Sequence, residues 1–303
     1  MYLLGVILAV SSSIANFMGQ ILQKKAINDV RTGDDVSMKD VIKKPLWITG
    51  LICIVVFTTV LNGFAQNFIG PALIPGLFSS GLIVLAIGSV KILGERLKKE
   101  EWLALFMIIS GIILVSLSRL SIETDLDRFR DTSFVIRLSV ASVMLITLWL
   151  TFFYGGKKLK KHKAVIMAIG SGLPFALGNI WMFALVDSLG RLLGGGHNLL
   201  NGVVFAISSF IMGTTQILGL VHFNKTLAAG NASIVVPIQQ IPQQIMPVIT
   251  YFVIFALSPP APVSFFYISG GILLIVTAGF LLGKRHTSQE KNSPAAADTE
   301  AQN

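Results

Sequence analysis

Uncharged polar side chains recur at helical spacing inside long apolar stretches of this 303-residue chain. In the first stretch, Ser12, Asn16 and Gln20 follow one another four residues apart, so a helix would place them on one stripe. Lys24 is the next member of this series. A polar side chain at membrane depth has to face protein or a water-filled cavity, so the stripe indicates a polar surface inside a helical bundle.

Later apolar stretches also carry polar residues at helical spacing. The stretch 228–257 has the most of them, and each of its three prolines removes a backbone donor. This segment is predicted to be kinked or broken, with carbonyls free to contact a solute. Such residues also hydrogen-bond simply between helices, but stripes from several helices favour a translocation pathway. The candidate substrate-binding residues are Ser12, Asn16, Gln20, Asn62, Gln66, Pro75, Asn179, Gln216, Pro237, Gln239, Gln240 and Gln243.

No arrangement of residues in the chain is typical of an enzyme. The four histidines are expected in loops or at a span end, without a metal-binding motif, and Cys53 has no second cysteine to pair with. Asp187, at a helix end, is the only acidic residue within the expected spans, so a carboxylate relay for protons or sodium is not expected. The sequence predicts no enzyme and no cofactor, and it leaves any metal ligands unknown.

The composition places these residues in an all-α polytopic membrane protein. Hydrophobic residues make up 53% of the chain and charged residues only 13%, about half of the usual soluble share of about 25%. Apolar stretches of about 20 residues, the length that spans a bilayer, recur along the chain. The nine expected helices are 2–23, 46–69, 71–93, 102–118, 133–154, 164–186, 202–223, 228–257 and 263–283.

The basic residues predict the orientation of these helices. When the loops are assigned to alternate sides, nineteen of the 24 Lys and Arg residues fall on one side. Basic loops remain cytoplasmic, so an external N-terminus and a cytoplasmic C-terminus in the plasma or inner membrane are expected. The run KKLKKHK at 157–163 is then a cytoplasmic anchor next to the lipid bilayer and not a nucleic-acid site.

An internal duplication sets the domain organisation. Ser12 and Gly19 correspond to Ser171 and Gly178 at an offset of 159 residues, and similar matches recur at offsets of 159 and 162 further along. Four helices on each side of one linker helix would make the second half run inverted, which places a site between the halves. The expected parts are repeat 1–118, linker helix and basic loop 119–163, repeat 164–283 and a disordered cytoplasmic tail 284–303.

Three stretches resemble the NIPA-type magnesium transporter family of the drug/metabolite transporter (DMT) superfamily, and the chain is also similar to the EamA-like transporters. The stretches are VSSSIANFMGQILQKK at 10–25, the region 47–115 with NGFAQNFIGPALIPG and GERLKKEEW, and FNKTLAAGNASIVVPI at 223–238. The resemblance covers most of residues 1–283, and nine helices is that family's usual count. The positions that match its motifs are Ser12, Ser13, Lys24, Lys25, Pro71, Pro75, Glu95, Asn224, Ser233 and Pro237.

The resemblance implies a secondary transporter that moves a small polar solute or ion by alternating access, with Mg²⁺ as the candidate. Members of the family often place a Glu in the second helix, near Val60 here, and this chain has no acid in that region. An exporter of drug-like or metabolite compounds is therefore an alternative, and a non-transporting membrane scaffold is an alternative of another class. A homodimer is left open by the sequence.

Overall fold

A computed structural model describes residues 2–30, 38–69, 74–118, 120, 126–158, 163–195, 198–259 and 261–291. The side chains at 38, 66, 67, 75, 156–158 and 285–291 lie outside this description. Within the described ranges all regular elements are helices. This agrees with the predicted all-α class, because long apolar stretches in a bilayer satisfy their backbone groups as helices.

The described residues up to 118 form seven α-helices and one π-helical turn. The π-helix η1 lies between α3 and α4 without a break in the chain, so these three elements form one long helical segment. The bounds are α1 Tyr2–Val30, α2 Met38–Ile42, α3 Pro45–Ile52, η1 Cys53–Phe57, α4 Thr58–Ile69, α5 Ile74–Phe78, α6 Gly81–Lys91 and α7 Lys99–Leu117.

The remainder of the chain forms longer helices. A short 3₁₀ helix, η2, precedes the helix predicted as the linker, and a π-helical turn, η4, follows α11. The bounds are η2 Leu126–Arg130, α8 Thr132–Lys158, α9 Lys163–Leu193, α10 Leu199–Ala229, α11 Ala232–Ile249, η4 Thr250–Ile254 and α12 Pro262–Lys291.

Seven helical segments in the described part of the chain are long and apolar enough to cross a membrane. They confirm a polytopic membrane protein. The two other stretches that the sequence predicts as spans are also helical. One is divided into α5 and α6 by a turn at Ser79 and Ser80, and the other is α11 followed by η4. The seven spans are Tyr2–Val30, Pro45–Ala65, Lys99–Leu117, Thr132–Gly155, Lys163–Leu193, Leu199–Ala229 and Pro262–Lys284.

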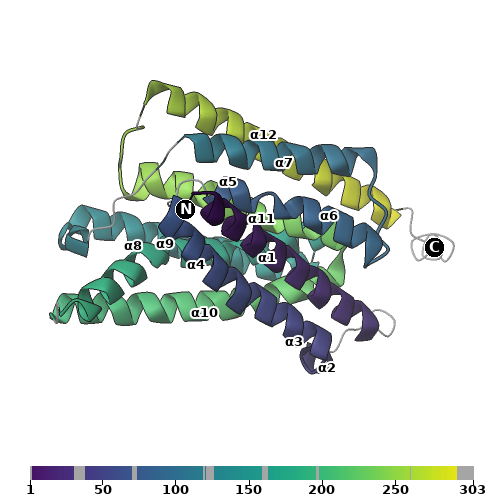
Figure 1. The fold of residues 1–303 in the computed structure, drawn as a ribbon, viewed down its shortest axis with the longest axis horizontal. Helices are drawn as coiled ribbons and strands as arrows, with labels where there is room; N and C mark the ends of the chain where they lie inside the picture. The colour runs from purple at the N-terminus through teal and green to yellow at the C-terminus, as the bar shows by residue number, and fades with distance from the viewer. Residues whose placement is uncertain are drawn as a thin grey trace.

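The helices from the two parts of the chain are interleaved in space. Figure 1 shows α7 and α12 side by side along one edge of the bundle, α10 along the opposite edge, and α1 crossing between them. One buried apolar cluster joins both parts, with Ile21 of α1 and Leu85 of α6 in the same cluster as Ile238 of α11 and Ile275 of α12. The central position of α1 explains why its polar residues are buried.

Several helix ends differ from the prediction, and α1 and α9 also extend past their expected ends, to Val30 and Leu193. α10 continues to Ala229, beyond the expected end at residue 223, and α12 continues to Lys291, beyond residue 283. α7 begins at Lys99 and therefore includes Glu101, which is 1% exposed and whose carboxylate accepts a hydrogen bond from the Lys98 backbone amide. The sequence placed Glu101 outside the spans because the apolar run starts after it.

Candidate functional site

The polar residues of α1 are the centre of the candidate site. Ser12, Ser13, Gln20, Gln23 and Lys24 are each at most 6% exposed. α1 is surrounded by α3, α4, α5 and α6 and also contacts α10 of the second part of the chain. Hydroxyl, amide and ammonium groups buried at this depth need partners, because an unpaired buried polar group costs about 1–3 kcal/mol.

Ser13 meets the interruption between α5 and α6. Its hydroxyl donates a hydrogen bond to the Phe78 carbonyl, 2.6 Å away, at the end of α5. The hydroxyls of Ser79 and Ser80, in the turn that follows, donate to the carbonyls of Gly76 and Leu77. These carbonyls are therefore already occupied, and the interruption is a packed structural feature.

The amides of α1 differ from Ser13 because part of their hydrogen-bonding capacity is unused. The Gln20 side-chain NH₂ donates to the Asn16 side-chain oxygen at 2.8 Å, which confirms that two predicted residues of the stripe meet. The Gln20 oxygen and both amide atoms of Gln23 are buried without a partner among the described residues. Buried amide oxygens of this kind can accept from a polar solute or from the water shell of a cation.

α11 supplies the matching groups from the second part of the chain. Residues 232–240 are all buried, and the Gln239 side-chain oxygen has no partner in the part of the chain that the structure describes. Gln240 is 9% exposed and Gln243 is half-buried. Gly172 of α9 has no side chain, which lets α9 approach the Gln239 backbone closely.

The three prolines of α11 do not break the helix. α11 is continuous from Ala232 to Ile249 through Pro237, Pro242 and Pro247, so the predicted break is absent, and the π-helix η4 begins after the last proline. Each proline still lacks the amide that would bond four residues earlier. Packing of α11 against α9, α12, α6 and α7 supports the helix despite these losses.

The other candidate residues have varied positions. The Ser12 hydroxyl bonds within its own helix to the Ala9 carbonyl at 3.0 Å, and Asn62 is half-buried with an unpartnered side-chain oxygen among the described residues. Asn179 is exposed on α9, whereas Gln216 is half-buried and lies next to Gly178. The side chains of Gln66 and Pro75 lie outside the described residues.

One end of the bundle is held by charged groups at the α10–α11 junction, residues 227–233. The Lys24 ammonium donates to the Leu227 carbonyl and, at 2.7 Å, to the Gly230 carbonyl. The Glu95 carboxylate accepts from the backbone amides of Ala232 and Ser233 at 2.7 and 2.9 Å.

Trp47 adds a neutral contact beside this junction. Its indole N–H donates to the Asn224 side-chain oxygen at 2.9 Å, and the Asn224 NH₂ donates to the Leu220 carbonyl. The sequence does not single out Trp47 or Gln23 as site residues, because their roles depend on contacts between helices and not on spacing within one helix.

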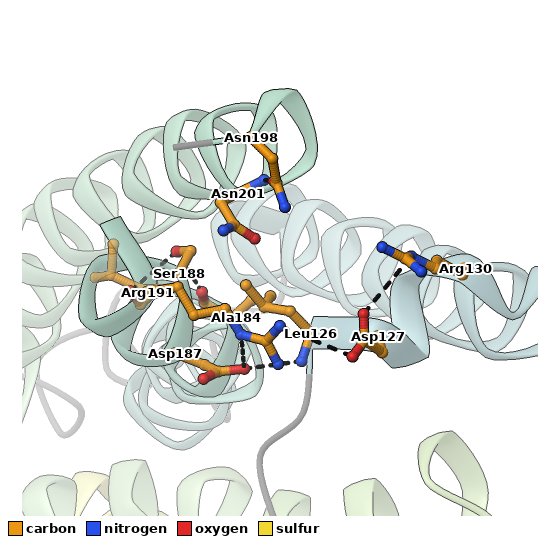
Figure 2. A network of polar contacts seen from close by, with 10 residues as sticks. Leu126, Asp127, Arg130, Ala184, Asp187, Ser188, Arg191, Asn198 and Asn201 are labelled. Atoms are coloured by element: carbon orange, nitrogen blue, oxygen red, sulfur yellow. Dashed lines mark hydrogen bonds and ion pairs between the residues drawn. The ribbon is translucent and has the colours of Figure 1, made fainter. Parts of the chain in front are cut away.

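Ion pairs gather at the other end of the bundle, shown in Figure 2. The Asp187 carboxylate on α9 accepts from the Leu126 backbone amide at 2.8 Å and pairs with Arg191 at 3.5 Å. Arg191 also reaches Asp127 at 3.8 Å, and Asp127 pairs with the exposed Arg130. The carboxylate of Asp187 is thus engaged by the linker segment and by an arginine.

His222 lies inside α10 and not at the end of a span as the sequence suggested, because α10 runs to Ala229. The histidine is 1% exposed, and its Nδ1 accepts a hydrogen bond from the Trp149 indole at 3.2 Å. Phe153 lies edge-on to the imidazole ring, with the ring centroids 5.1 Å apart. Within the described residues no group of three or more His, Cys, Asp or Glu side chains could hold a metal ion.

Comparison with known proteins gives one match. The family described as Magnesium transporter NIPA matches residues 1–288, which include every helix described above except the last three residues of α12. No curated protein and no solved structure matches the chain.

Proposed function

The chain belongs to the NIPA magnesium transporter family, and from this membership we propose that it is a secondary transporter that carries Mg²⁺ across the bilayer by alternating access. As a member of a transporter family it is a membrane protein and not an enzyme. One structural observation carries the proposal further. Buried amide oxygens without partners among the described residues come from both parts of the chain, Gln20 and Gln23 on α1 and Gln239 on α11.

The chemistry of these groups suits a hydrated cation. Mg²⁺ gives up its water reluctantly and is usually held through several retained waters. Neutral amide oxygens can accept hydrogen bonds from those waters, whereas direct coordination would need carboxylates. The proposed pathway is therefore weakly binding, with Asn16, Gln20, Gln239, Gln240 and Gln243 as its lining residues and the other sequence candidates beside them.

In our proposal the chain crosses the membrane nine times as two inverted repeats of four helices on each side of the linker helix α8. The contacts support this arrangement. Lys24, Glu95 and the α10–α11 junction should share one side after nine crossings, and they are in contact. Leu126 and Asp187 should share the opposite side, and they are also in contact.

The glycines of α7 and α12 give a second argument for the duplication. Ser110-Gly111 corresponds to Ser269-Gly270 at an offset of 159 residues, and α7 packs on α12 where Gly111 meets Gly271. A two-fold axis between the repeats would bring equivalent positions close together, and Gly271 is the chain neighbour of the equivalent Gly270. The repeats would then be 1–118 and 164–283, with an external N-terminus and a cytoplasmic C-terminus in the plasma or inner membrane.

Flux into liposomes that contain only the purified protein tests the proposal. We expect Mg²⁺ entry, recorded with a trapped Mg²⁺-sensitive dye, to exceed entry into empty liposomes. Gln240→Leu and Gln243→Leu should abolish this flux, while Asn28→Leu, at an exposed amide near the end of α1, should retain it. Transport of a drug-like or metabolite compound without Mg²⁺ flux would favour the exporter, and absence of all flux would favour a scaffold.

A further inference from the structure

The turn between α10 and α11 places the C-terminal end of α10 beside the N-terminal end of α11. α10 ends at Ala229 and α11 begins at Ala232, so the last carbonyls of one helix and the first amides of the other lack partners within their helices. The carbonyl end of a helix carries partial negative charge and the amide end partial positive charge. A cation is favoured at the first and an anion at the second.

Both helix ends receive their compensating charge from the first repeat. Lys24 of α1 places its ammonium on the Leu227 and Gly230 carbonyls, and Glu95, which follows α6, accepts from the Ala232 and Ser233 amides. Trp47 of α3 bonds Asn224 in the last part of α10. Contacts from three separate elements of the first repeat therefore converge on residues 224–233 of the second.

The Lys24 contact with Leu227 in this connection is shielded from water. Lys24 is 4% exposed and Leu227, whose carbonyl it reaches, is fully buried, whereas Gly230 and Glu95 are half-buried. If the ammonium left the buried Leu227 carbonyl, that carbonyl would lose its donor until water entered, which is costly in such surroundings. The two repeats can separate at this end only if both Lys24 and Glu95 release the junction and become hydrated.

The same device is missing from the positions that the duplication makes equivalent. An offset of 159 to 162 residues relates Lys24 to residues 183–186 and Glu95 to residues 254–257, and all eight of these residues are uncharged. Two of them, Phe183 and Phe255, pack against each other with ring centroids 5.0 Å apart. Both also contact Phe134 of α8, so they fasten the linker helix and not the other repeat.

We infer that Lys24 and Glu95 are gating residues that hold the basic-loop end of the transporter closed and so favour a resting state closed at that end. The inference rests on the proposed function, because a gate has meaning only in a protein that opens. It assigns to two charged side chains a role in the conformational equilibrium and not in solute binding.

Distance measurement between spin labels tests the gate without any solute. The single cysteine is first replaced by Cys53→Ala, and Asn28→Cys on α1 and Lys225→Cys on α10 then introduce labels at exposed positions on the two sides of the junction. In lipid nanodiscs, double electron–electron resonance should give one short distance population. Lys24→Met and Glu95→Gln should each add a longer population, because either change removes one charge from the junction.

Matched variants separate gating from general damage. Lys25→Met and Glu100→Gln remove the same charges at exposed neighbouring positions and should leave the distances unchanged. Lys24→Arg keeps the charge and should restore the short population. If Lys24→Met does not fold, Glu95→Gln supplies the test alone. Unchanged distances in the folded neutral variants would overturn the gate, and a longer population with no Mg²⁺ flux would retain the gate and overturn the proposed function.

Discussion

Gly111 of α7 and Gly271 of α12 meet backbone to backbone. A Cβ atom added to either glycine would lie 2.7 Å from the carbonyl oxygen of the other. Membrane helices pack tightly where small residues let their backbones approach, since apolar burial alone gives little advantage in lipid. This crossing holds the last helix of one proposed repeat against the last helix of the other, so it should be sensitive to a single methyl group.

Gly111→Ala and Gly271→Ala should therefore destabilise the folded protein by about 1–3 kcal/mol, the usual cost of overpacking. Thermal unfolding in detergent, followed by the loss of monodisperse protein, measures this change. Gly213→Ala is the matched control, because it lies within α10 and a Cβ there meets nothing within 4 Å. Equal stability of all three variants would show that the α7–α12 crossing is looser than described.

Trp47→Phe should destabilise the α10–α11 junction. The substitution keeps an aromatic ring at a site 7% exposed but leaves the Asn224 side-chain oxygen without its donor, which costs about 1–3 kcal/mol. Thermal unfolding of Trp47→Phe, Asn224→Leu and the double variant forms a double-mutant cycle. The double variant should lose less stability than the sum of the losses in the two single variants. Trp102→Phe, at an exposed site in α7, should have little effect.

The long apolar stretches were sufficient to predict the helices, because each spans a bilayer length and carries few charges. Helix ends were harder to predict. The expected end of α10 at residue 223 lies among the polar residues His222, Asn224 and Lys225, yet the helix continues, with Trp47 bonded to Asn224 and Trp149 bonded to one ring nitrogen of His222. Partners from distant helices decide whether a polar residue ends a span, and one sequence does not show those partners.

The candidate site was predicted in part. Helical spacing was enough to place Asn16 and Gln20 together, and their hydrogen bond confirms it. Gln23 was missed because it lies outside that stripe, and its burial depends on Gly50 of α3, where an added Cβ would lie 3.0 Å from the Gln23 side chain. The sequence predicted that α11 is kinked or broken, and the break is absent because packing with neighbouring helices supports the helix despite the three missing backbone donors.

Asp187→Ala should loosen the segment before α8. The Leu126 backbone amide donates to the Asp187 carboxylate, and Leu126 itself is fully buried. Without this acceptor the amide should exchange with solvent deuterium faster, which hydrogen–deuterium exchange with mass spectrometry can measure on a peptide covering η2. Arg130→Ala is the control, since this 70% exposed side chain forms a surface ion pair of small value. If the peptide covering η2 exchanged at the same rate in both variants, Asp187 would not stabilise η2.

Gln20→Leu should reduce Mg²⁺ flux about tenfold while the protein remains folded. The leucine keeps a similar volume at a site 6% exposed, but it removes an amide oxygen that has no partner among the described residues. Loss of one hydrogen bond to a hydrated ion corresponds to about 1.4 kcal/mol, or about one factor of ten. Gln239→Leu on α11 should act in the same direction, because the proposed pathway takes its oxygens from both proposed repeats. Initial rates in liposomes, normalised to the inserted protein, provide the measurement, with Asn28→Leu as the control. Wild-type rates in both glutamine variants would mean that these amides serve packing and that the ion passes elsewhere.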